Sequence, residues 1–281
     1  MNLFQMIEFL RFYRAAVTKY QLHSTFVYEL SVAMLEDSRG YYAFSDIEAL
    51  REKMLSSEVM VNFTDFGTGS GGQFRQKTEE TASQSTLRSV RSIARQSGSS
   101  ARQGQMLFRL VNFLQPQRML ELGTSVGIGA MYLAAAARES QMISLEGSDE
   151  IAHVARTHLD FMGLSKKVEV REGAFEQTLL PALQNLKSLD LIFLDGNHRK
   201  TPTLHYFETC LPFAHAKTVF VFDDIYGSTE MTEAWEQIKN HSSVTLTLDF
   251  FELSLAFIDP DFREKQHFKI VPARWKPWMF F

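Results

Sequence analysis

The chain has 281 residues, of which 45% are hydrophobic and 22% are charged, and its formal net charge is −4. This composition is that of an ordinary globular protein and excludes a fibrous or largely disordered chain. The weak negative charge gives no overall attraction to nucleic acid, and the single cysteine, Cys210, excludes an internal disulfide and a cysteine-based zinc site.

The N-terminal segment is expected to be helical. Apolar residues from Leu3 to Leu10 recur at helical spacing, and Ser24 can cap a second helix. Charged residues interrupt the first stretch too often for a signal peptide, and no uncharged apolar run of about 18 residues occurs. We therefore expect a cytoplasmic protein without a membrane span, in which residues 1–103 form a helical extension with a mobile connector and residues 104–281 form the main domain.

The segment VNFTDFGTGSGG, at 61–72, has the pattern of a strand followed by a glycine-rich turn. The residues after it are polar and lack the apolar face that a packed crossover helix needs. We therefore do not expect this turn to be the main cofactor loop. A glycine loop that reaches over a pocket is the alternative.

Residues 76–105 are rich in Ser, Gln, Thr and Arg, which predicts a mobile connector containing one helix. Leu87, Val90 and Ile93 share amphipathic helical spacing within it. One side of that helix would carry Arg88, Arg91 and Arg95. These arginines fit either a solvated face or a lid over an anionic substrate.

The most informative segment is RMLELGTSVGIGA, at 118–130. A short apolar strand carries Glu121 near its end and leads into a turn with Gly123 and Gly127, after which a helix begins. A Walker phosphate loop would need Lys and Ser or Thr after the last glycine, and a dinucleotide loop would have the order GxGxxG instead of GxxxGxG. The carboxylate favours a ligand with an ammonium or sulfonium group over a pyrophosphate, which it would repel.

These residues resemble the first motif of the class I S-adenosylmethionine-dependent methyltransferases, an acidic residue followed by Gly-x-Gly-x-Gly. Here ELGTSVG has Ser125 at the middle position, as is common in the branch that resembles small-molecule O-methyltransferases. The segments HSTFVYEL and DFGTGS resemble the N-terminal extension of a bacterial subgroup of methyltransferases. The resemblance implies S-adenosylmethionine as the cofactor, bound at this turn through Glu121, Gly123, Thr124, Ser125 and Gly127.

After Gly104, helices and strands alternate, which predicts a doubly wound α/β fold with a mostly parallel sheet and ligands at the carboxyl ends of the strands. The expected strands are 118–122, 141–146, 167–171, 189–194 and 217–222, and the expected helices are 105–114, 127–138, 149–162, 175–184, 202–212 and 229–240. The segments VTLTLDF and LSLAFID lie too close together for a helical crossover, so they predict an antiparallel C-terminal hairpin. Such a hairpin resembles the end of the seven-stranded methyltransferase sheet, and a dinucleotide domain usually lacks it.

Glu146 ends the second strand about 20 residues after the glycine-rich turn, which is the spacing of a carboxylate that meets the ribose hydroxyls of an adenosine-containing cofactor. We assign Glu146 to that role, with Gly147 beside it. In the family that the chain resembles, residues after the third strand flank the adenine ring. The resemblance therefore implies adenine contacts from Gly173, Ala174 and Phe175.

Asp195 and His198 follow the fourth strand, and Asp223 and Asp224 follow the fifth. In the metal-dependent O-methyltransferases that this pattern resembles, an aspartate after strand four and an aspartate–asparagine pair after strand five hold a divalent cation. Here the pair is Asp-Asp. Three carboxylates would repel one another without Mg²⁺, another divalent cation or some other neutralising partner.

The four residues leave two interpretations open. A cation at Asp195, Asp223 and Asp224 would favour the deprotonated acceptor. Without a cation, His198 is the best candidate base, unless it is a loop histidine that only bonds to a neighbour. The catalytic residues would be Asp195, His198 and Asp224, and Asp195 would also contact the cofactor.

The sequence thus predicts methyl transfer from S-adenosylmethionine to a small-molecule acceptor, with a hydroxyl oxygen as the favoured acceptor atom. Two alternatives are a non-catalytic cofactor-binding or scaffold protein with the same fold and an NAD-linked oxidoreductase. Neither nucleic acid nor a membrane is an expected partner. The aromatic tail ARWKPWMFF would pack against the body of the protein or against a second subunit, so a homodimer stays open.

Overall fold

The central domain contains the predicted alternation of helices and strands. The computed structural model describes residues 2–64, 85–96 and 99–279. Its strands are β3 (Arg118–Leu122), β4 (Gln141–Glu146), β5 (Val168–Glu172), β6 (Leu189–Leu194) and β7 (Ala214–Asp223). Its helices are α5 (Ala101–Leu114), α6 (Ile128–Ala136), α7 (Asp149–Phe161), α8 (Phe175–Leu186), α9 (Lys200–Cys210) and α10 (Thr229–Asn240).

The main sheet has eight strands in the order β10-β8-β9-β7-β6-β3-β4-β5. The five strands from β3 to β7 are parallel, and the predicted hairpin of β8 (Leu246–Asp249) and β9 (Leu253–Phe257) places β9 antiparallel between β7 and β8. The expected count of seven strands was therefore one too low. The additional strand is β10 (Gln266–Lys269), which pairs in parallel with β8 and is too short and polar for a clear sequence signal.

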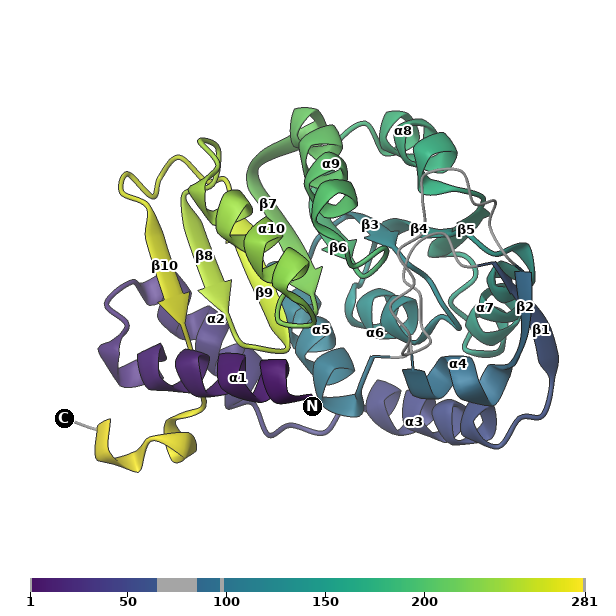
Figure 1. Cartoon of the computed structure of the whole chain (residues 1–281), viewed down its shortest axis with the longest axis horizontal. Helices are drawn as coiled ribbons and strands as arrows, with labels where there is room; N and C mark the ends of the chain where they lie inside the picture. The colour runs from purple at the N-terminus through teal and green to yellow at the C-terminus, as the bar shows by residue number, and fades with distance from the viewer. Residues whose placement is uncertain (1, 65–84, 97–98, 280–281) are drawn as a thin grey trace.

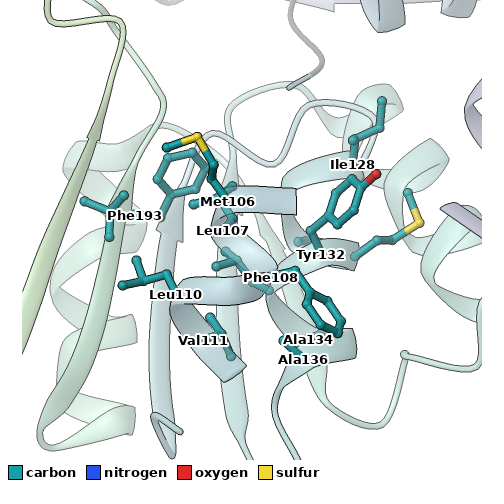
Figure 2. Packing of buried hydrophobic residues seen from close by; sticks show 14 of the residues in the cluster. Met106, Leu107, Phe108, Leu110, Val111, Ile128, Tyr132, Ala134, Ala136 and Phe193 are labelled. Atoms are coloured by element: carbon teal, nitrogen blue, oxygen red, sulfur yellow. The ribbon is translucent and has the colours of Figure 1, made fainter. Parts of the chain in front are cut away.

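Both faces of the sheet are buried under helices (Figure 1). Helices α5, α6 and α7 cover one face, and α8, α9 and α10 cover the other. Within β6, Leu191 and Phe193 point to the first face, and Ile192 and Leu194 point to the second. The central strands are apolar runs rather than alternating patterns because both of their faces are buried. Figure 2 shows side chains of α5 and α6 meeting near Phe193.

The N-terminal segment forms the expected helices α1 (Leu3–Ala15), α2 (Thr25–Leu35) and α3 (Tyr42–Leu55). Helix α1 buries Phe12 on the α8–α10 side of the sheet, whereas α2 and α3 add to the other core. The expected division of the chain at residue 103 stays a prediction. Among the described helices, none is long and apolar enough to cross a membrane.

The C-terminal tail packs against α1, which is one of the two placements expected for it. The hydroxyl of Tyr13 donates to the carbonyl of Trp275 (2.6 Å), and Nζ of Lys276 donates to the carbonyl of Ala16 (2.6 Å). Trp275 also meets Phe9 edge to face. Helix α1 and the C-terminal tail therefore stabilise each other through these contacts.

The connector differs from its prediction. Strands β1 (Met60–Thr64) and β2 (Ser85–Ser89) form a separate antiparallel pair, and α4 (Val90–Gln96) begins only after them. Leu87 and Arg88 thus lie in a strand, because this segment pairs with β1 instead of continuing the helix. The glycine-rich segment that follows β1 lies outside the described residues, so the structure does not test its expected role.

Candidate active site and cofactor pocket

The glycine-rich turn joins β3 to α6 at the carboxyl end of the sheet. Gly123 has a φ of +102°, and a Cβ atom there would collide with the carbonyl oxygen of Asp195. A residue with a side chain would be strained at this position and would push β3 and β6 apart. The turn is tied to the neighbouring strand because the backbone N–H groups of Gly123 and Thr124 donate to Leu145 O (2.9 and 3.1 Å).

Glu121 is completely buried behind this turn. The hydroxyl of Ser144 donates to its Oε2, whereas its Oε1 has no hydrogen-bond partner among the described residues. Burial raises the pKa of Glu121 to about 8. An unpaired buried carboxylate oxygen is costly, so Glu121 is a candidate to bind a donor or a cation.

Two serine hydroxyls near the turn are also buried without a partner in the part of the chain that the structure describes. They belong to Ser99 and Ser125. Ser99 precedes α5, and Nη1 of Arg51, from α3, donates to its carbonyl oxygen (2.7 Å). A Cβ atom at Gly129 would lie 2.6 Å from Oε1 of Glu121 and 3.7 Å from Oγ of Ser99, so the two unpaired groups are neighbours.

Glu146 lies at the end of β4, where the sequence placed it. Its carboxylate accepts from the backbone N–H groups of Ser125 (2.8 Å) and Ser148 (3.0 Å). Burial raises the pKa of Glu146 above its ordinary value, although these donors oppose the shift. The carboxylate thus joins the glycine-rich turn to the start of α7. Gly147, also predicted, follows it directly.

The three residues expected near an adenine ring lie beside Glu146 and β6. The N–H of Gly173 donates to the carbonyl of Glu146 (2.9 Å), and Ala174 caps α8. The ring of Phe175 lies so close to Gly196 that a Cβ atom there would be 2.7 Å away. The structure therefore brings these predicted residues to the same end of the sheet as the turn.

The carboxyl ends of β6 and β7 form an acidic cluster. One ligand atom each of Asp195, His198 and Asp223 lie within 4.8 Å of one another, and Nε2 of His198 is 3.6 Å from Oδ1 of Asp195. Burial, followed by the charge of Asp223, raises the pKa of Asp195 well above its ordinary value. Burial and Asp223 also raise the pKa of Asp224 to about 6, although Asp224 does not belong to the close group of three.

Residues outside the predicted set complete this cluster. Nε2 of Gln103, near the start of α5, donates to Oδ1 of Asp223. Glu252, between β8 and β9, forms an ion pair with Arg102 (2.9 Å), whose guanidinium lies over the ring of Trp275 (5.1 Å). Burial raises the pKa of Glu252 above its ordinary value. The cluster therefore has a wall made by α5 and by the C-terminal region.

This donor set fits a divalent cation. Carboxylate oxygens suit Mg²⁺ and Mn²⁺, and an imidazole nitrogen is a common ligand of the later transition metals. Burial, followed by repulsion from Asp223, raises the pKa of Asp195, and a cation would remove the repulsion. Asp195 and Asp223 are the two residues common to the predicted metal site and the observed group of three.

Comparison with known proteins shows what part of the chain is similar to. Residues 120–225 match the family model described as a methyltransferase domain. Catechol O-methyltransferase from Niastella koreensis is 32% identical over 129 residues, which cover 45% of this chain and 57% of that protein. Catechol O-methyltransferase from Mycobacterium tuberculosis is 33% identical over 132 residues, which cover 45% of this chain and 56% of that protein. The alignments thus span little more than half the length of these relatives.

Solved structures agree on the fold. The SAH-bound methyltransferase from Podospora anserina has a TM-score of 0.57 at 17% identity, with 85% of this chain and 97% of that chain covered. The class I methyltransferase fold expected from the ELGTSVG motif is confirmed.

Proposed function

We propose that this chain, whose residues 120–225 match the family model of a methyltransferase domain, transfers a methyl group from S-adenosylmethionine to a hydroxyl oxygen of a small-molecule acceptor. One observation carries the proposal: Oε1 of Glu121 is buried beside the glycine-rich turn with no partner in the described structure. A positively charged ligand group would relieve that cost. S-adenosylmethionine carries such groups in its ammonium and sulfonium, whereas the pyrophosphate of NAD would be repelled.

The cofactor would lie along the carboxyl ends of β3, β4 and β5. Glu146 would accept from the ribose hydroxyls, and Gly173, Ala174 and Phe175 would border the adenine. Glu121 and the hydroxyls of Ser99 and Ser125 would surround the methionyl part. When bound, S-adenosylmethionine supplies a methyl group activated by its sulfonium sulfur. The residues of the chain mainly have to align this donor with the acceptor at about 3–3.5 Å and exclude water.

The acceptor would bind at the acidic cluster. The matching relatives are named catechol O-methyltransferases, so we propose a catechol-type acceptor with neighbouring hydroxyls. Asp195, Asp223 and Asp224 would hold a divalent cation, whose Lewis acidity would favour the deprotonated hydroxyl. In the alternative without a cation, His198, whose Nε2 lies 3.6 Å from Oδ1 of Asp195, would remove the hydroxyl proton.

A product assay tests the proposal. The full chain is incubated with S-adenosylmethionine carrying a labelled methyl group, with Mg²⁺ and catechol, followed by a panel of other hydroxylated metabolites. Mass spectrometry should detect a product that carries the label. Binding of the cofactor without a labelled product from any acceptor would instead indicate a non-catalytic binding protein.

A further inference from the structure

A cavity lies between the end of α2, the N-terminal half of α5 and the C-terminal tail, and no residue of the glycine-rich turn lines it. Its volume is about 250 Å³, which is just below the range of roughly 300–1,000 Å³ typical of small-molecule sites. Its walls combine charged and apolar residues. Those that carry charge are Glu36, Asp37, Arg102, Arg109 and Arg274.

The two carboxylates of this cavity already have partners. Arg39 donates to both oxygens of Asp37, at 2.7 to 3.0 Å, and this contact lowers the pKa of Asp37 to about 2. Glu36 accepts from the backbone N–H of Ala273 (2.8 Å) and lies 3.7 Å from Nζ of Lys19. Neither carboxylate is therefore needed to neutralise an arginine of the cavity.

The three arginines of the cavity differ in how far their charges are paired. Arg102 is paired with Glu252 on the side of the acidic cluster. Arg109 is partly buried, its Nε has no hydrogen-bond partner in the described residues, and its guanidinium lies over the ring of Phe44 (5.6 Å). Arg274 is exposed, and no carboxylate of the described chain forms an ion pair with it.

We propose that this cavity binds the phosphate or carboxylate group of a small molecule that has an apolar body. The planar guanidinium groups of Arg109 and Arg274 match the geometry of such anions, and the buried Nε–H of Arg109, which has no acceptor in the described residues, would gain from one. Met34, Leu35 and Met106 supply the apolar wall for the rest of the ligand. The site does not overlap the residues that would hold the cofactor, and it does not rest on the proposed methyl transfer.

Calorimetric titration of the full chain with phenyl phosphate, and with phenol as its neutral analogue, tests this site. We expect saturable binding of phenyl phosphate alone. Arg109→Gln and Arg274→Gln should each weaken it about tenfold or more, since each removes hydrogen bonds to a charged group. Arg118→Gln, a matched charge removal on the exposed start of β3, should leave the affinity unchanged.

Equal affinity for phenol, no saturable binding of phenyl phosphate, or binding that neither cavity substitution weakens would overturn the proposal. Because Arg274 is exposed, its substitution stays informative even if Arg109→Gln does not fold.

In the cell, the anionic group could belong either to the methyl acceptor or to a separate ligand. Enzyme kinetics distinguishes these two sources. If the anionic group belongs to the acceptor itself, phenyl phosphate should raise the KM for an acidic catechol such as 3,4-dihydroxybenzoate. If it belongs to a separate ligand, phenyl phosphate should bind without raising that KM. If the chain transfers no methyl group, only this kinetic assignment of the anion's source is lost. The calorimetric titration still tests the anion site, because it measures binding without turnover.

Discussion

Gly129 is the reason that helix α6 can pass directly over the carboxylate of Glu121. A Cβ atom at residue 129 would lie 2.6 Å from Oε1 of Glu121, well inside van der Waals contact. Gly129, the third glycine of the motif, is therefore needed to leave room for the Glu121 carboxylate and not to form the turn. This relationship leads to the first prediction.

Gly129→Ala should weaken binding of S-adenosylmethionine by about tenfold or more, because it displaces the carboxylate that we propose meets the ligand's positive charge. Crowding at this buried position should also cost about 1–3 kcal/mol of unfolding free energy. Calorimetry and urea denaturation measure the two effects. Gly40→Ala is the control, since a Cβ there meets no atom within 4 Å. Unchanged cofactor affinity in Gly129→Ala would contradict the assigned role.

Glu121→Gln should remove a pH dependence of stability. The carboxyl ionises at an ordinary pKa of 4.5 when unfolded and at about 8 when folded, so the folded state holds the extra proton between these values. Stability of the parent protein therefore falls as pH rises from about 4.5 to about 8, by at most about 1.4 kcal/mol per pH unit for this group. Relative to the parent protein, Glu121→Gln should gain stability from pH 5 to pH 8 in urea denaturation. If the stability difference between Glu121→Gln and the parent protein does not change with pH, the raised pKa of Glu121 is contradicted.

Asp195→Asn should raise stability at pH 8, because it removes a buried carboxylate that neighbouring carboxylates repel. It should also reduce methyl transfer by about a hundredfold or more, because it removes a group at the reacting centre. Thermal unfolding with Mg²⁺ and with a chelator gives a second readout. Mg²⁺ should stabilise the parent protein at pH 8 and have little effect on Asp195→Asn. The exposed Asp46→Asn is the charge-matched control. Activity that a chelator leaves unchanged would rule out the cation.

Arg51→Ala should raise the KM for S-adenosylmethionine several-fold with little change in kcat. Within the described part of the chain, Arg51 bonds neither to the turn nor to the acidic cluster, but its Nη1 donates to the carbonyl of Ser99, whose hydroxyl borders the proposed cofactor site. Steady-state kinetics measures the effect, and Arg51→Lys should restore part of it. The exposed Arg11→Ala on α1 is the control. An equal loss in kcat would indicate a general structural defect instead.

Much of the central domain could be predicted because its strands are strongly patterned. The bounds of β3, β4 and β6 agree with the sequence prediction, since each is a short apolar run followed by glycine or acidic residues. Parallel strands place their carboxyl ends at one edge of the sheet. The residue order alone was therefore enough to bring Glu121, Glu146 and Asp195 to the same edge.

The remaining parts of the site come from segments distant in sequence. Ser99 and Gln103 lie around the start of α5, and Glu252 lies between two strands of the terminal hairpin. Only tertiary packing brings them to the pocket and to Asp223, so no local spacing could identify them. The polar helix start SSARQG was the one available signal for Ser99 and Gln103. Strand β10 was missed because four residues are too few to show a period.

Calorimetric titration of the full chain with S-adenosylmethionine, S-adenosylhomocysteine and NAD in one buffer tests the central claim most directly. We predict saturable binding of both sulfur-containing ligands at one site and no binding of NAD, with Glu146→Ala weakening both. Binding of NAD, or no binding of either sulfur-containing ligand, would contradict the account.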